Sequence, residues 1–176
     1  MSPQIGPRVR RMSSALGAML LTAGCGHSGG GPYLSASWTG SDTGRIAARA
    51  VASWCPVANR LEVKAVQEDV GFALAIYPEK DLASGEFPVF DPGIDTVHRP
   101  GAAGVTRWFT EKQLQGYQSD SGGVTLARSG DKLQLQFRLR MRSLGGEGTI
   151  RATGRATGLV PGSCPADSVP NASPRQ

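Results

Sequence analysis

The sequence predicts an all-β fold: a single antiparallel β-sandwich or small β-barrel of about eight or nine strands at residues 33–164. The strongest sign is the segment 132–143, where five apolar side chains alternate with polar ones, a period of two that leaves little room for a helix. Short runs of β-forming residues recur along the chain, separated by turns rich in Gly, Pro and Asp. No long helical pattern is convincing, so one β-domain is the simplest interpretation.

The first half of this domain contains three expected strands and one ambiguous segment. Residues 33–38 form a plausible first strand, which ends at the Gly-rich turn 40–44. Residues 45–54 fit a helix or a strand nearly equally, because their alanines allow a helix while their apolar residues also alternate with polar ones. Residues 61–65 alternate cleanly, and residues 72–77 are apolar on both faces, which predicts a central strand.

The second half is dominated by a long hairpin. Four further strands are expected before it, at residues 85–90, 105–110, 113–118 and 123–128. Residues 91–104, with two prolines and three glycines, form the longest irregular connection. The strand 132–143 should then return through a Gly-rich turn into 149–159, a hairpin that would suit a lipocalin-like closed barrel by analogy of fold. Residues 165–176 form a polar tail that buries too little surface to order itself.

The N-terminal segment has the features of a bacterial export signal. Three arginines precede an apolar run at residues 15–23, whose nine residues are too few to span a bilayer as a helix. The segment then ends in LTAGC at residues 21–25, which resembles the lipobox of bacterial lipoprotein signal peptides, with Thr22 where that family usually has Leu. The resemblance implies removal of residues 1–24 and attachment of diacylglycerol to Cys25.

This resemblance also implies a location. A lipid on Cys25 would anchor the chain to a membrane of the bacterial cell envelope. Gly26 rather than Asp follows the cysteine, which in Gram-negative lipoproteins implies export to the outer membrane, with the domain facing the periplasm. Residues 25–32 would form a flexible Gly-rich tether between the lipid and the domain.

Charge and cysteine content limit which classes of function the chain can have. Three of the nineteen basic residues precede Cys25, so sixteen remain against fourteen acidic residues, and the charge is no argument for nucleic-acid binding. With Cys25 assigned to lipid, Cys55 and Cys164 are expected to form a disulfide in the oxidising envelope. The chain has no CxxC motif and only two histidines, so no metal and no cofactor is expected.

Two motifs are weak signs of catalysis or ion binding. The string DSGG at residues 120–123 occurs around the nucleophile of trypsin-like proteases, but His98 is the only candidate base, and a Gly-rich hairpin turn is the better interpretation. Asp91 and Asp95 could offer oxygens to calcium, yet a turn is again the simpler interpretation. We therefore expect a protein that is not an enzyme.

Aromatic and basic side chains provide the other candidate sites. The three tryptophans could form the floor of a sugar or lipid site, but core packing is the simpler interpretation: Trp38, Trp54 and Trp108. Pairing of the terminal hairpin would put five arginines on one face: Arg138, Arg140, Arg142, Arg151 and Arg155. Such a patch could bind phosphates of lipid or lipopolysaccharide, or an acidic protein surface. The ordinary polar outer face of a strand pair is the simpler alternative.

Two functions follow from these expectations. The first is a lipid-anchored envelope protein whose domain is a non-catalytic binding or interaction module. The alternative is a lipocalin-like carrier of a small apolar or anionic ligand inside the barrel. Residual volume around Leu133, Leu135, Phe137 and Leu139 would favour the carrier, and a filled interior would favour the interaction module. Neither the ligand nor the oligomeric state follows from the sequence.

Overall fold

A computed structural model describes residues 31–96, 99–110 and 113–164. Its elements are strands: β1 Tyr33–Gly40, β2 Gly44–Cys55, β3 Arg60–Gln67, β4 Val70–Tyr77, β5 Gly85–Pro88, β6 Gly101–Phe109, β7 Leu114–Ser129, β8 Lys132–Ser143, β9 Thr149–Leu159 and β10 Gly162–Ser163. Among these residues there is no helix with the length and apolar character needed to cross a bilayer. Cys25, the lipobox-like segment, His98 and the tail 165–176 lie outside the described residues.

The strands form a closed antiparallel barrel. Eight of them follow one another around the ring in the order β1-β9-β8-β7-β6-β4-β3-β2, and pairing of β1 with β2 closes it. Closure gives each strand of the ring a neighbour on both sides and removes the open edges of a sandwich. The all-β prediction is confirmed, and of its two variants the barrel is the one that forms.

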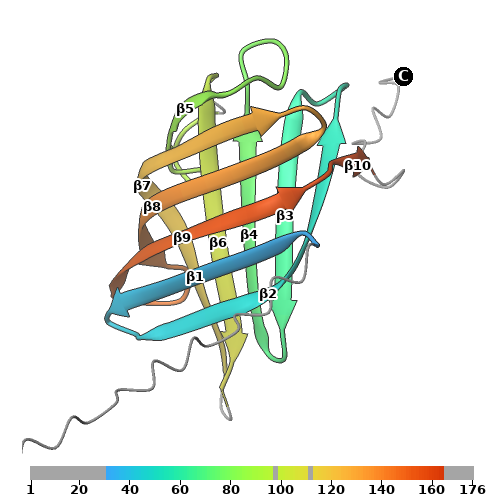
Figure 1. Cartoon of the computed structure of the whole chain (residues 1–176). Coiled ribbons are helices and arrows are strands. Elements are labelled where there is room, and N and C mark those ends of the chain that lie inside the picture. The colour runs from blue at the N-terminus through green and yellow to red at the C-terminus, as the bar shows by residue number, and fades with distance from the viewer. Residues whose placement is uncertain (1–30, 97–98, 111–112, 165–176) are drawn as a thin grey trace, which may run out of the picture.

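The ring is flattened into two walls that cross at an angle (Figure 1). The front wall contains β8, β9 and β1, and the back wall contains β3, β4 and β6. Strands β2 and β7 are the corners, because each pairs with both walls: β2 with β1 and β3, and β7 with β8 and, at its first residues, β6. Residues 44–49 of β2 pair with β1 and residues 50–55 with β3, so the ambiguous segment 45–54 is a strand.

The predicted break between 113–118 and 123–128 is wrong. These segments are one strand, β7, which continues through the DSGG string by a β-bulge between Ser119 and Ser121. Gly122 takes a φ of +128°, and a Cβ there would collide with the backbone of the adjacent β8. A residue that looks locally like a turn is therefore a site where two strands approach closely. The irregular connection is also shorter than expected, because β6 begins at Gly101.

The barrel interior is filled by large side chains. Phe72 of the back wall stacks on Phe137 of the front wall with ring centroids 5.2 Å apart. Trp108 lies between Trp38 and Tyr117, with centroid distances of 5.4 Å to each ring. The residues named above as a possible cavity lining are all buried in this one cluster: Leu133, Leu135, Phe137 and Leu139. Packing of this kind leaves the barrel a core rather than a channel.

The disulfide predicted from the cysteine count is present. Cys55 at the end of β2 is bonded to Cys164, with Cα atoms 4.9 Å apart and a sequence separation of 109 residues. Just before Cys164, β10 pairs in parallel with β2 at Ser53 and Trp54. The bond thus ties the C-terminal end of the domain to an early strand, which is the structural role expected for it.

Candidate functional site

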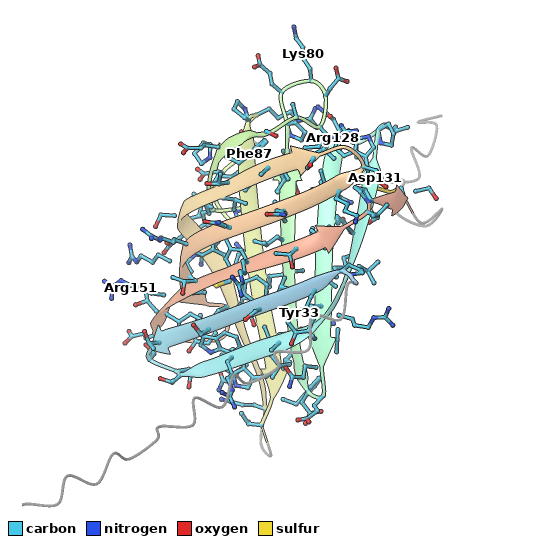
Figure 2. All side chains as sticks on the ribbon, in the orientation of Figure 1. Tyr33, Lys80, Phe87, Arg128, Asp131 and Arg151 are labelled. Carbon is cyan, nitrogen blue, oxygen red and sulfur yellow. A yellow bond between two sulfur atoms is a disulfide. The ribbon has the colours of Figure 1, made fainter. Side chains whose placement is uncertain are left out.

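The outer face of the β8–β9 hairpin brings the five predicted arginines together. In strands, side chains of alternate residues share a face, so Arg138, Arg140 and Arg142 project outward from β8. From β9, Arg151 and Arg155 project to the same side, and Figure 2 shows Arg151 on the outside of the barrel. All except Arg142 are exposed.

Two of these arginines oppose each other directly. Arg140 is the cross-strand partner of Arg151 in the β8–β9 register. Like charges directly opposite each other in an antiparallel pair are destabilising. The nearest counter-charge is Asp120 of the β7 bulge, whose carboxylate oxygen lies 3.8 Å from Nε of Arg140. This contact is too long for a hydrogen bond, so the repulsion is only partly compensated.

Arg142 belongs to a different structure. Its Nε donates to Oδ2 of Asp91 at 2.8 Å and its terminal nitrogen to Oδ1 at 3.0 Å, a two-pronged ion pair. The Asp91 carboxylate also accepts from the side chain of Gln118 and the backbone N–H of Gly93. These contacts, the Arg142 hydrogen bond first, lower the pKa of Asp91 to about 2 although its burial opposes the shift. The clamp fixes the β5–β6 connection to β7 and β8.

The clamp also accounts for the DPGID segment. Oδ2 of Asp95 accepts from the backbone N–H of Asp91, and the Asp95 N–H donates back to the carbonyl of Asp91. Both carboxylate oxygens of Asp91 already accept hydrogen bonds from the protein. The segment is therefore a turn, as predicted. Across the residues that the structure describes there is no group of three or more His, Cys, Asp or Glu side chains able to hold a metal ion.

The structure adds to this face Arg45, a residue that the sequence pattern did not place there. Ring closure places Arg45 of β2 opposite Ser37 of β1, and Ser37 is in turn opposite Thr153 of β9. The sequence contained only a weak sign of it, the alternation of Arg45 and Arg49 with apolar residues, and the closure that brings it there is long-range. We call the outer face that bears the following side chains the arginine face: Arg45, Arg138, Arg140, Arg151 and Arg155.

Most of the arginine face lacks counter-charges. Within the described parts of the chain, Arg140 is the only member with a carboxylate within 4 Å. A guanidinium carries five N–H donors in a planar fork that fits carboxylate and phosphate groups. Four such groups with no acidic partner form a surface of positive potential that attracts anions.

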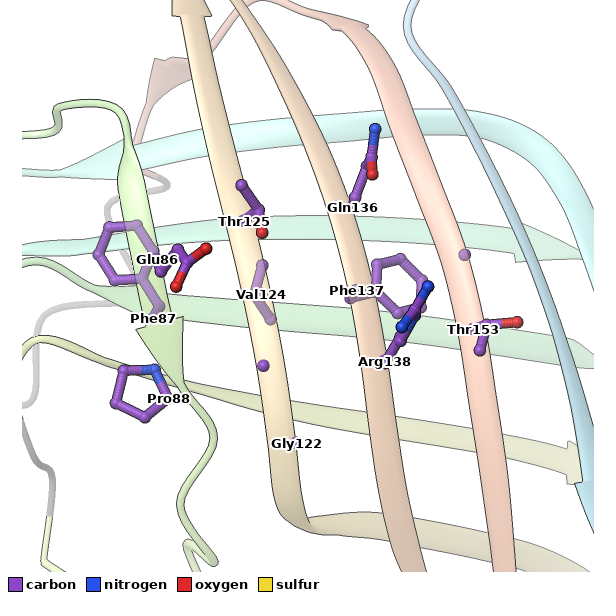
Figure 3. Close-up of a pocket in the computed structure, with 12 residues that line it drawn as sticks. Glu86, Phe87, Pro88, Gly122, Val124, Thr125, Gln136, Phe137, Arg138 and Thr153 are labelled. Atoms are coloured by element: carbon purple, nitrogen blue, oxygen red, sulfur yellow. The ribbon is translucent and has the colours of Figure 1, made fainter.

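The arginine face borders two connected surface depressions. One, of about 610 Å³, lies over β5, β7, β8 and β9, and Figure 3 shows the residues that line it, Arg138 and Thr125 among them. The other, of about 770 Å³, lies over β8, β9, β1 and β2 and is lined by Arg45 and Arg155. Both are lined by Gln136, Thr153 and Gly154, so they join at β8 and β9.

A third depression, of about 840 Å³, lies at the end of the barrel beside the disulfide. Half-buried Trp54 and exposed Val160 line it, and buried Leu82 and Leu133 contribute to it. It is the candidate mouth for a carried ligand. The remaining tryptophans, Trp38 and Trp108, are core residues of the stacked interior rather than a surface platform.

The DSGG string does not form a hairpin turn, because it lies within β7. Within the bulge, the Ser121 hydroxyl donates to the carboxylate of its neighbour Asp120 at 2.9 Å. Its candidate base, His98, is among the residues whose placement is not described. The arginine face remains the candidate functional site, because its guanidiniums can bind anions. A scan of protein-family models and searches of curated proteins and solved structures found no match to this chain.

Proposed function

We propose that this chain is a lipid-anchored protein of the bacterial cell envelope whose barrel is a non-catalytic module that binds an anionic partner. The observation that carries the proposal is the arginine face, where four guanidiniums have no carboxylate within 4 Å among the described residues and Arg140 directly opposes Arg151. Such an arrangement weakens the isolated fold slightly and strengthens attraction to anions. Anionic lipid or lipopolysaccharide and an acidic envelope protein are the candidate partners.

The proposed anchor supports an encounter between this face and a membrane. Fully extended, the eight residues from Cys25 to Pro32 span at most about 29 Å, so the barrel would remain close to the bilayer. The tether would enter β1, a strand of the wall that bears the arginine face, opposite Arg49 and Thr157. The export signal and Gly26 favour the outer membrane and a domain facing the periplasm.

The filled interior supports binding on the outside. Phe72 and Phe137 meet across the middle of the barrel, and Trp38, Trp108 and Tyr117 fill one end. A carrier needs an enclosed volume of several hundred Å³ for a ligand. The lipocalin-like carrier is the second candidate, favoured by the depression of about 840 Å³ beside Trp54. Quenching or shift of Trp54 fluorescence by an apolar probe, lost in Val160→Asp, would support it.

Vesicle co-sedimentation tests the first candidate. The Cys25→Ser chain, which cannot be lipidated, is mixed with phosphatidylglycerol or phosphatidylcholine vesicles at low and high salt. We expect binding to the anionic vesicles only, weakened by salt. Each surface arginine is worth about 1 kcal/mol against an anionic membrane, so Arg138→Gln with Arg151→Gln and Arg155→Gln should lower the affinity by roughly a hundredfold.

The back wall offers a matched control. Arg60→Gln with Lys64→Gln removes two positive charges from a region where both already contact Glu62, so binding should change little. Equal losses in the two variants, or no binding at low salt, would contradict the proposed role for anionic lipid. The anchor is tested separately: protein from native membranes should have the mass of residues 25–176 plus acyl chains.

A further inference from the structure

We infer that the arginine face is part of a groove that binds an extended acidic glycan, a chain of sugars bearing carboxylate or phosphate groups. The inference rests on the proposed function and names the ligand class of the same surface. Its starting point is the junction of the two depressions at Gln136, Thr153 and Gly154. The two depressions adjoin at these residues and together extend over the outside of the barrel from β5 to β2.

The strand register defines the course of this groove. One row of opposed residues runs from Gln136 through Arg155 and Ser35 to Ala47. The second row runs beside it, from Arg138 through Thr153 and Ser37 to Arg45. The rows cross the strands rather than follow them. Because neighbouring strands are about 4.8 Å apart, the path from β5 to β2 is roughly 24 Å long, enough for several sugar units.

Small residues line part of this path and leave room above the strands. An added Cβ at Gly123 would have no atom within 4 Å, which shows open space above β7. On β1 and β2 the short side chains of Ser37 and Ala47 form the floor. The long side chains of Arg138 and Arg155 line the groove beside them. A chain lying in the groove would therefore contact guanidiniums and the low floor at the same time.

The chemistry of the lining suits a hydroxyl-rich anionic polymer. Hydroxyl and amide groups from Ser37, Thr153 and Gln136 can both donate and accept hydrogen bonds, as sugar hydroxyls do. Arg138, Arg155 and Arg45 provide charged donors at intervals along the path, which fit acidic groups repeated along a chain. Among the described residues that line the two depressions, Glu86 at the β5 end is the only one with a carboxylate.

The same geometry disfavours the two other partners. Strands β7, β8, β9 and β1 are paired on both sides along the groove, so an added peptide could not gain the main-chain hydrogen bonds of strand addition. A bilayer surface would reach the tips of Arg138 and Arg155 but not the floor at Gly123 and Ser37. A flexible polymer can reach both.

A substitution that fills the groove tests the inference without changing the charge of the arginine face. Gly123→Leu should fold, because its Cβ enters open space and its φ is not in the left-handed region. Gly145→Leu is the matched control, since that glycine also has open space but lies in the β8–β9 turn, away from the groove. The probe is a set of oligogalacturonates of increasing length, titrated into the full Cys25→Ser chain, with dextran as the neutral polymer.

We expect the affinity for oligogalacturonate to rise with oligomer length until the groove is full, and we expect no binding of dextran. Gly123→Leu should lower the oligogalacturonate affinity at least about tenfold, whereas Gly145→Leu should not lower it. Anionic-vesicle binding should be equal in the two glycine variants. Vesicle binding without oligogalacturonate binding would overturn the glycan inference and leave the proposed function standing. Equal glycan affinity in both variants would overturn the proposed groove. Failure of both probes would overturn the glycan inference together with the proposed role for anionic lipid.

Discussion

The front and back walls of the barrel differ in how their charged side chains are grouped. On the back wall, Arg60 and Lys64 both contact Glu62, with nitrogen–oxygen distances of 2.6 and 2.5 Å. On the front wall, Arg140 opposes Arg151, and in the described residues Arg138 and Arg155 have no carboxylate within 4 Å. Both walls share one core and one alternation of inward and outward side chains. An exposed arginine without a carboxylate within 4 Å in the described residues also occurs on the back wall, at Arg107 of β6. What distinguishes the front wall is therefore the clustering of such arginines on neighbouring strands.

The largest effect should be the same for both walls, because they meet in the interior. Phe72→Ala and Phe137→Ala each remove one ring of the same stack, and each should lower the free energy of unfolding by about 3–5 kcal/mol. Urea denaturation of the two single variants and the double variant measures the costs and their coupling. A large cost for one ring and a small cost for the other would mean that the two walls do not share the core equally.

A smaller effect is expected at the Asp91–Arg142 clamp, the place where the front wall has a true counter-charge. Asp91 has a pKa of about 2 in the folded protein, below its ordinary value of 3.8, so its ionised form stabilises the fold. That stabilisation is complete above about pH 4 and is lost as the pH falls towards 2. Asp91→Asn should therefore be less stable than the wild type at pH 7, with the difference shrinking between pH 4 and 2.

Asp120→Asn is the control for this clamp. Its carboxylate lies 3.8 Å from Arg140, beyond hydrogen-bonding distance, and the Arg140 side chain is 58% exposed. Exposed pairs of this kind contribute little, so its removal should change the unfolding midpoint at pH 7 less than Asp91→Asn does. If the two variants behave alike, the two-pronged geometry at Asp91 has no special stabilising role.

The sequence was sufficient for features that depend on local pattern. The strict alternation in 132–143, and the Gly-rich turn that returns the chain into 149–159, predicted β8 and β9 with their observed bounds. The shared face of five arginines followed from that hairpin. The disulfide was predicted because assigning Cys25 to lipid leaves two cysteines, Cys55 and Cys164, to pair with each other. These predictions hold because a two-residue period and a short hairpin need no information from distant parts of the chain.

The remainder depended on long-range contacts. Barrel and sandwich differ in whether β1 pairs with both β2 and β9, and no local pattern specifies that closure. The same closure brings Arg45 to the arginine face. Asp91 and Arg142 are 51 residues apart, so their ion pair was equally invisible. At Gly122 the local signal was misleading, because a glycine needed for close strand approach resembles one needed for a turn.

The smallest predicted effect separates the two walls most directly. Arg151→Thr removes one member of the opposed arginine pair and introduces a residue that suits a strand, so stability should rise by about 0.2–0.5 kcal/mol at low salt. The gain should fade at high salt, where the repulsion is screened. Arg60→Thr on the back wall loses its contact with Glu62 and should show no gain.

Denaturant unfolding of Arg151→Thr and Arg60→Thr at low and high salt measures these stability changes. A gain at Arg151 that salt abolishes, together with weaker binding of anions, would show that this arginine opposes folding and favours binding. Equal responses at Arg151 and Arg60 would mean that the front wall tolerates its charge as easily as the back wall does. The arginine face would then be an ordinary polar surface, and the argument for a partner would lose its physical basis.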